Sequence, residues 1–115
     1  MSPYVIPGLK YKFNGNYFSN EASADNIIDC MSEFFKITVP NIKSKKRQRE
    51  IVYARQWSIY FIKKHTRLTL KKIGAMFYRD HTTVIHSLQA VEYNLNSKFD
   101  NEYKTDFEIL KNKFF

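Results

Sequence analysis

Apolar residues recur with a helical period along most of the chain from residue 23 onward. Ile27, Ile28, Met31, Phe34 and Phe35 fall at offsets of one, four, seven and eight, which places them on one face of a helix. Similar apolar stripes occur in the segments that follow. The pattern predicts helices over 24–37, from 45 or 47 to 65, and over 69–77, 81–94 and 101–111. We therefore expect an all-α fold, a helical bundle.

Polar residues mark the starts of three of these helices. Ser23, Thr69 and Asp80 each precede an apolar stripe, and their side-chain oxygens can cap exposed backbone N–H groups. Pro40 closes the first helix, because proline disfavours helical backbone in the residue before it. Gly74 costs about 1 kcal/mol relative to alanine inside a helix. We expect this glycine to let another helix approach closely.

The first 22 residues differ from the rest. Residues 9–13 alternate apolar and basic side chains, and the Asn-Gly-Asn sequence at 14–16 is a turn signal, so a short hairpin or an arm packed on the core is expected. This arm is also a candidate site for a protein partner or for self-association. The predicted organisation is an N-terminal arm at 1–22, a helical domain at 23–97, and a C-terminal helix with an aromatic tail at 98–115.

The charge of the chain is concentrated in its middle. The net charge is +8. Residues 36–79 carry 13 Lys and Arg against one acid, Glu50, whereas the remainder carries 6 basic and 10 acidic residues. Such clustering indicates a surface that binds a polyanion, with nucleic acid as the first candidate and an anionic membrane surface as the second. The plain alternative is an evenly solvated surface.

Other function classes are disfavoured by what the sequence lacks. It has no apolar run of the roughly 18 residues that cross a bilayer and no signal-peptide pattern. Cys30 has no cysteine partner, so a reducing cytoplasm is the expected location. No phosphate-binding GxxxxGK[ST] occurs. His81 and His86 are five residues apart and do not share a helix face, and with His65 they complete no metal site. We expect no enzyme activity, cofactor, metal or nucleotide site.

Two of the predicted helices, 69–77 and 81–94, are joined by a short turn and form a helix-turn-helix pattern. In that motif the first turn of the second helix meets base edges in the major groove. The spacing predicts short polar side chains on its outward face: Asp80, His81, Thr82, Thr83, His86 and Ser87. A carboxylate can accept a hydrogen bond from cytosine N4, and a threonine methyl can contact the thymine methyl.

Three segments make the sequence recognisable. FYRDHTTVIHS at 77–87, SKKRQREIVYARQ at 44–56 and LTLKKIG at 68–74 together resemble the C-terminal DNA-binding domain of the bacterial replication initiator DnaA. The resemblance covers about residues 24–95. It implies a Trp-repressor-like helical bundle with a helix-turn-helix, and sequence-specific binding of double-stranded DNA at DnaA-box-like sites, with a role in replication initiation or its regulation.

The resemblance also implies a role for each matched position. The family inserts an arginine of its basic segment into the minor groove, and Arg47 occupies that position close to Lys45. Residues that match Asp80, His81 and Thr82 meet bases or the adjacent backbone in the major groove. The other matched residues contact the phosphate backbone: Arg55, Gln56, Lys63, Leu70, Lys71, Arg79 and Thr83. Phosphate contacts set the register, and base contacts set the sequence preference.

The chain departs from the family pattern in three places. Only Tyr78 stands where the family usually has two glycines before Arg-Asp-His, which shortens the turn. Gln89 and Ala90 replace a frequent basic pair. DnaA carries an ATPase domain before this region, whereas about two dozen residues precede the first matched helix here. We therefore expect a free-standing DNA-binding module that does not open an origin by itself.

Two other interpretations stay open from the sequence. A transcription regulator can use the same helix-turn-helix on an unrelated operator. A protein–protein interaction module of a phage or mobile element can carry a basic face incidentally, and the aromatic arm at 1–22 is its best support. A membrane-surface protein is weaker, since the basic residues do not lie opposite a wide apolar face.

Overall fold

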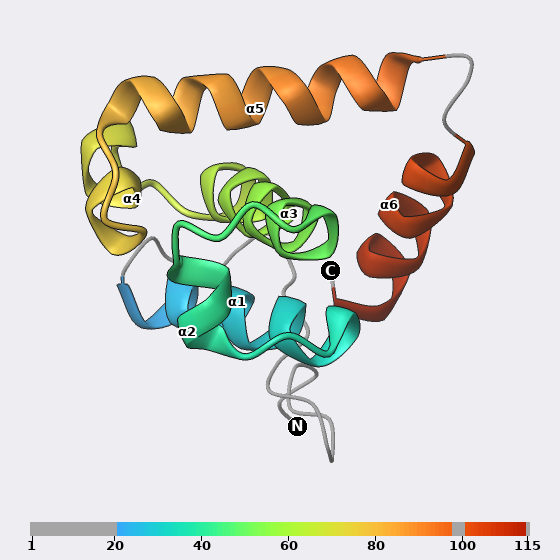
Figure 1. Cartoon of the computed structure of the whole chain (residues 1–115), viewed down its shortest axis with the longest axis horizontal. Coiled ribbons are helices and arrows are strands. Elements are labelled where there is room, and N and C mark those ends of the chain that lie inside the picture. The colour runs from blue at the N-terminus through green and yellow to red at the C-terminus, as the bar shows by residue number, and fades with distance from the viewer. Residues whose placement is uncertain (1–20, 98–100, 115) are drawn as a thin grey trace.

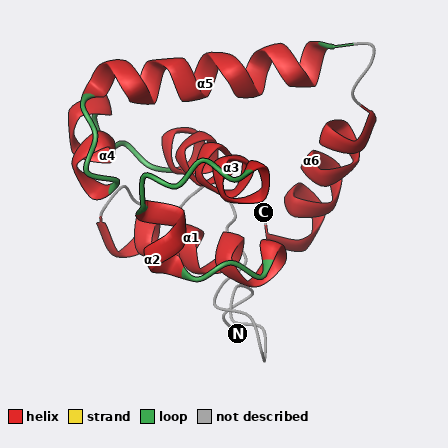
Figure 2. Ribbon diagram, in the orientation of Figure 1, coloured by secondary structure: helices red, strands yellow, loops and turns green. Residues whose placement is uncertain are grey.

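The computed structural model describes residues 21–97 and 101–114, and within these ranges the regular structure is entirely helical (Figure 1). Figure 2 shows helices joined by short loops. The helices are α1 Glu21–Phe35, α2 Val39–Lys43, α3 Arg49–His65, α4 Leu70–Met76, α5 His81–Asn96 and α6 Asn101–Phe114. The predicted all-α fold is confirmed for these ranges. The hairpin expected at 9–16 lies outside the described residues.

Helix α3 lies at the centre of the fold, in contact with α1, α2, α4 and α5. It is buried on several sides because its apolar side chains occupy more than one face. At most 2% of the surface is exposed in each of Trp57, Ile59, Phe61 and Ile62. Burying one such side chain contributes about 1.5–3 kcal/mol. The other helices therefore take their positions from α3. None of the helices that the structure describes is long and apolar enough to cross a membrane.

Aromatic stacking joins α6 to α3. The Trp57 ring stacks on Tyr103 with ring centroids 4.7 Å apart, and on Phe107 with centroids 5.8 Å apart. Leu110 and Phe114 of α6 are fully buried in the same core. Offset aromatic pairs contribute about 0.5–1.5 kcal/mol beyond their buried area. The C-terminal helix thus shares one core with the helices before it.

The N-terminal helices differ from the predictions in two ways. Helix α1 begins at Glu21, so the expectation that Ser23 caps it is wrong; Ser23 lies in the first turn and is buried. Helix α2 was not predicted. Pro40 stands in its first turn, where proline is tolerated because that N–H has no helical partner, and the Thr38 hydroxyl accepts a hydrogen bond from the Asn41 amide. A proline that ends one helix here also begins the next.

The basic segment before α3 is a loop and not the first turn of the helix. Helix α3 begins at Arg49, later than the expected 45 or 47, and its cap residue Gln48 makes no side-chain hydrogen bond. Glu50 lies in the first turn, where a negative charge is favoured by the helix dipole. Lys45 and Arg47 therefore precede the helix.

A close backbone contact at Gly74 holds α4 against the start of α5. A Cβ atom added to Gly74 would lie 2.6 Å from the Arg79 carbonyl oxygen and 3.1 Å from that of Asp80. The Arg79 amide donates a hydrogen bond to the Gly74 carbonyl at 2.8 Å. The predicted close approach is confirmed, although its partner is the turn and not a helix.

The shortened turn depends on Tyr78, whose φ is +58°. This left-handed conformation costs a residue other than glycine about 1–2 kcal/mol. The turn therefore makes up for the missing glycine by placing a tyrosine in the conformation that a glycine would adopt freely. The neighbouring Phe77 is fully buried, which fixes the backbone at this point.

We predict that Gly74→Ala destabilises the fold. The added methyl meets backbone atoms of Arg79 and Asp80, and overpacking typically costs about 1–3 kcal/mol, which exceeds the gain in helix propensity of about 1 kcal/mol. Urea denaturation measures the change in unfolding free energy. Ala75→Ser, at the exposed neighbouring position, should stay within about 0.5 kcal/mol of wild type. A more stable Gly74→Ala variant would refute the close contact.

Candidate nucleic-acid interface

The amino-terminal tip of α5 is exposed to solvent and is organised by Asp80. One oxygen of its carboxylate, Oδ1, accepts hydrogen bonds from the Thr83 amide at 2.9 Å and from the Thr83 hydroxyl at 3.1 Å. These hydrogen bonds to Thr83 hold the pKa of the Asp80 carboxyl below its ordinary value. An ionised carboxylate has about four acceptor positions. Asp80 therefore caps α5 as predicted and keeps acceptor capacity for an outside donor.

The side chains next to this cap point away from the core. His81 and Thr82 are exposed, whereas Val84, on the opposite face of the same turn, is fully buried. The helical period produces this division, because the buried face continues through Val91. A hydrogen-bonding tip is thus presented at the end of a helix whose other face is fixed in the core.

Two arginines attach the basic loop, residues 44–48, to the body of the domain. Arg55 of α3 donates from Nε to the Ile42 carbonyl at 2.8 Å and from Nη2 to the Lys46 carbonyl at 3.0 Å. Arg79, just before α5, donates from Nη2 to the Ser44 carbonyl at 2.8 Å and from Nη1 to the Phe77 carbonyl at 2.7 Å. We call these two residues the arginine clamp. The clamp fixes the loop relative to the tip of α5.

The arginine clamp concentrates positive charge. Burial, and then the charge of Arg79, lowers the pKa of Arg55 to about 10. Burial also lowers the pKa of Arg79. With a pKa of about 10, Arg55 remains charged at neutral pH, where its charge is opposed by that of its neighbour. An anion bound close to the pair would relieve this repulsion.

An open groove runs between the basic loop, α3 and the start of α5. Its lining residues are Lys45, Arg47, Val52, Arg55, Arg79 and Thr83. Five of these were predicted interface residues, and four of them are cationic. Lys45 and Arg47 are exposed. The groove, which we call the basic groove, therefore has the charge and the access that a phosphate backbone requires.

Comparison with known proteins identifies the family. The family described as bacterial DnaA protein helix-turn-helix matches residues 24–91, more than half of the chain. The chain belongs to this DnaA helix-turn-helix family.

Two curated relatives carry the name chromosomal replication initiator protein DnaA. The protein from Oleidesulfovibrio alaskensis is 33% identical over 100 residues, which cover 85% of this chain and 22% of the relative. The protein from Rippkaea orientalis is 38% identical over 71 residues, which cover 61% of this chain and 16% of the relative. The chain thus spans about a fifth of the length of these relatives.

Four residues assigned to phosphates through the DnaA resemblance lie outside the basic groove. Lys63 is exposed near the end of α3, and Lys71 is exposed in the first turn of α4. Leu70 and Gln56 are half-buried. Helix α4, which begins at Leu70, lies at the same end of the molecule as the start of α5 (Figure 1). The contact of these four residues with DNA stays a prediction, as it does for every residue of the interface.

The structure adds a positioning role to the two clamp arginines. Arg55 is only 7% exposed, and two of its nitrogens bind carbonyls. The DnaA motif identifies both arginines but contains no sign that they bind the loop. Val52 was missed as a groove residue, although it lies three positions before Arg55 and so on the same side of α3.

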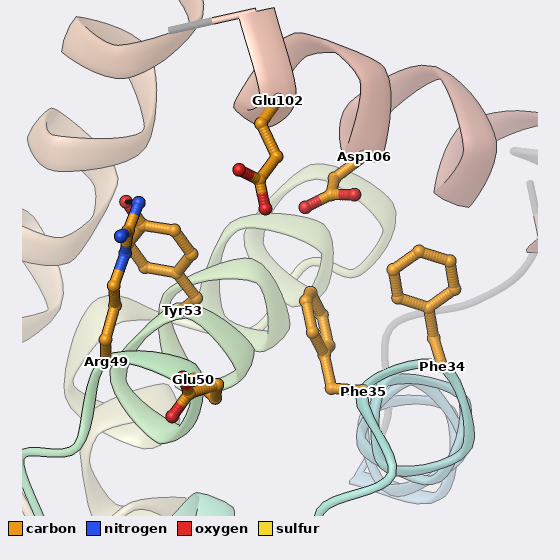
Figure 3. Close-up of a pocket in the computed structure, with 7 residues that line it drawn as sticks. All are labelled: Phe34, Phe35, Arg49, Glu50, Tyr53, Glu102 and Asp106. Atoms are coloured by element: carbon orange, nitrogen blue, oxygen red, sulfur yellow. Dashed lines mark hydrogen bonds between the residues drawn. The ribbon is translucent and has the colours of Figure 1, made fainter.

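A second hollow lies away from the basic groove, between α1, α3 and α6 (Figure 3). The carboxylates of Glu102 and Asp106 point from α6 into it. It is lined by Phe34, Phe35, Arg49, Glu50, Tyr53, Glu102 and Asp106 and encloses about 240 Å³. Small-molecule sites usually enclose about 300–1,000 Å³, and three carboxylates against one arginine repel phosphate. This hollow is therefore a poor site for DNA.

The three histidines of the sequence are candidate metal ligands. No group of three potential metal-ligating residues occurs among the residues that the structure describes. His65 stacks on Phe61 with ring centroids 5.9 Å apart. Burial, and then the charge of Lys64, lowers its pKa to about 4. His65 is thus a neutral side chain of the core margin at physiological pH.

We predict that Arg55→Met releases the basic loop. Loss of the guanidinium leaves the carbonyls of Ile42 and Lys46 without these donors. Ile42 is buried whereas Lys46 is exposed, so the unfolding free energy should fall by about 1–3 kcal/mol, the cost of one unsatisfied buried carbonyl. Hydrogen exchange of the amides at 44–48 should accelerate. Arg67→Met makes the same change at an exposed position and should leave both measurements near wild type. Equal effects of the two substitutions would show that the clamp is unimportant.

Proposed function

We propose that this domain binds double-stranded DNA in a sequence-specific manner, at sites of the DnaA-box type, and acts in replication initiation or its regulation. The observation that carries the proposal is the exposed tip of α5 beside the arginine-clamped basic loop. In helix-turn-helix proteins the tip of the second helix enters the major groove. A binder of this kind would act on chromosomal DNA in the cytoplasm.

The proposed contacts divide into base contacts and backbone contacts. Asp80, His81 and Thr82 read bases, since they are exposed side chains at the tip of α5. Arg47 enters the neighbouring minor groove from the basic loop. The groove residues Lys45 and Thr83, together with Lys63 and Lys71 on the helices, bind phosphates. The clamp arginines add charge and hold the basic loop at a fixed distance from the tip of α5. The loop and the tip can then reach neighbouring grooves of the same duplex.

The replication role rests on the names of the relatives. Both are chromosomal replication initiator proteins, and this chain corresponds to about a fifth of each. The part proposed for this domain in initiation or its regulation is therefore the recognition of initiator-type DNA. A transcription regulator with an unrelated operator is the second candidate, because Tyr78 and the Gln89-Ala90 pair depart from the family pattern close to the reading helix.

Selection of bound sequences from a random duplex pool tests the target. We predict a single enriched motif of the DnaA-box type at 0.15–0.2 M salt. Thr82→Val should weaken binding to that motif by about 1–3 kcal/mol and relax the preference at one base position. Thr105→Val makes the same chemical change on α6 and should bind like wild type. An unrelated enriched motif would support the operator-binding alternative. An equal loss of affinity by Thr82→Val on all sequences would show that Thr82 does not read a base.

The salt dependence of affinity tests the backbone contacts separately. Between 50 and 200 mM salt, affinity should fall steeply, and Lys63→Ala should lower the slope of log K against log salt by about 1, since one phosphate contact is lost. Lys113→Ala, an exposed lysine of α6, should leave the slope unchanged. A weak dependence on salt in the wild-type protein would contradict phosphate-driven binding.

A further inference from the structure

Tyr78 combines three properties that a turn residue rarely has together. Its backbone is left-handed, with φ of +58°. Its side chain is 72% exposed. It is also the single residue that joins buried Phe77 to the clamp residue Arg79. Glycine or asparagine would adopt this backbone with less strain. Residues held in unfavourable backbone conformations concentrate at functional sites, so the aromatic side chain calls for an explanation outside the fold.

A shallow groove lies beside Tyr78. It is lined by Val39, Pro40, Lys43, Ser44, Lys45 and Tyr78, and we call it the Tyr78 groove. These six residues include two lysines and no acidic residue. One wall is apolar, from the first turn of α2, and the other carries positive charge. A deoxyribose–phosphate chain has this same division into an apolar sugar and an anionic phosphate.

The Tyr78 groove continues the basic groove. Lys45 lines both of them. The Arg79 guanidinium donates to the Ser44 carbonyl at 2.8 Å, so the turn that carries Tyr78 and the loop that carries Lys45 form one fixed unit. A DNA strand that follows the basic groove past Lys45 would arrive at the phenol of Tyr78.

We propose that the Tyr78 groove binds the sugar–phosphate backbone of the strand that separates the major groove read by α5 from the minor groove entered by Arg47. The Tyr78 hydroxyl donates a hydrogen bond to one phosphate, Lys43 and Lys45 neutralise the charge nearby, and Val39 and Pro40 contact the sugars. This inference rests on the proposed function and extends the interface to a side chain that the family motif lacks.

The test uses the full chain and the duplex found by selection. Tyr78→Gly removes the ring and relieves the backbone strain, so the variant should remain folded, which thermal denaturation verifies. It should bind the duplex about tenfold more weakly, the usual scale for a hydrogen bond to a charged group. Tyr78→Phe keeps the ring and loses only the hydroxyl, and most of the tenfold loss of affinity should already appear in this variant. Tyr93 is 76% exposed on α5, and Tyr93→Phe is the matched control, which should bind like wild type.

A scan of neutral methylphosphonate linkages along the duplex locates the contact. One linkage should weaken wild-type binding several-fold and weaken the binding of Tyr78→Phe clearly less, because the variant has already lost the phenol hydrogen bond and keeps only the attraction of the lysines. The same linkage should weaken Tyr93→Phe as it weakens wild type. Coupling of this kind at one phosphate, and at no distant one, is the result expected.

Three results would overturn the inference. Wild-type affinity in both Tyr78 variants, with Thr82→Val still weakened, refutes the Tyr78 groove and leaves the proposed function intact. Weaker binding by Tyr78→Gly without coupling to any phosphate shows that the ring acts elsewhere. Failure of the wild-type chain to bind any duplex removes the proposed function, and this inference with it. Binding of a peptide at the Tyr78 groove in place of DNA would likewise exclude it.

Discussion

The proposed DNA interface depends on two guanidinium groups that bind main-chain carbonyls. Arg55 approaches the basic loop from α3 and Arg79 approaches it from the turn before α5, and between them they fix the carbonyls of Ile42, Ser44 and Lys46. A loop with several cations would otherwise spread into solvent, because its charges repel one another. The arginine clamp turns this loop into a rigid surface at a fixed position relative to the tip of α5.

Holding this arrangement has an electrostatic cost. The clamp places two partly desolvated positive charges close together, and the lowered pKa of each arginine reports that cost. The remainder of the fold supports it through the central position of α3 and the backbone contact at Gly74. A polyanion in the basic groove would offset the repulsion. The same feature that strains the free domain thus favours the bound state, which links stability to the proposed function.

Much of this arrangement follows from the sequence, but its most important contacts do not. The helical period of the apolar residues predicts the long helices. The caps at Thr69 and Asp80 are confirmed, and they are predictable because a cap depends only on residues close in the sequence. The positioning role of Arg55 was not predictable, since its carbonyl partners lie nine and thirteen residues away and carry no side-chain pattern. Helix α2 was missed because Pro40 indicates a helix end as readily as a helix start. The short turn at Tyr78 is visible in the sequence, but the left-handed backbone that closes it is revealed only by the structure.

The most direct test of the account is an amide NMR titration of the domain with a selected duplex. The central claim is that the tip of α5 and the arginine-clamped loop meet DNA as one surface. We expect the largest shifts at residues 45–47 and 79–83, changing together at one stoichiometry, with residues 102–110 of α6 unaffected. Shifts centred on α6, or movement of the tip without the loop, would contradict it.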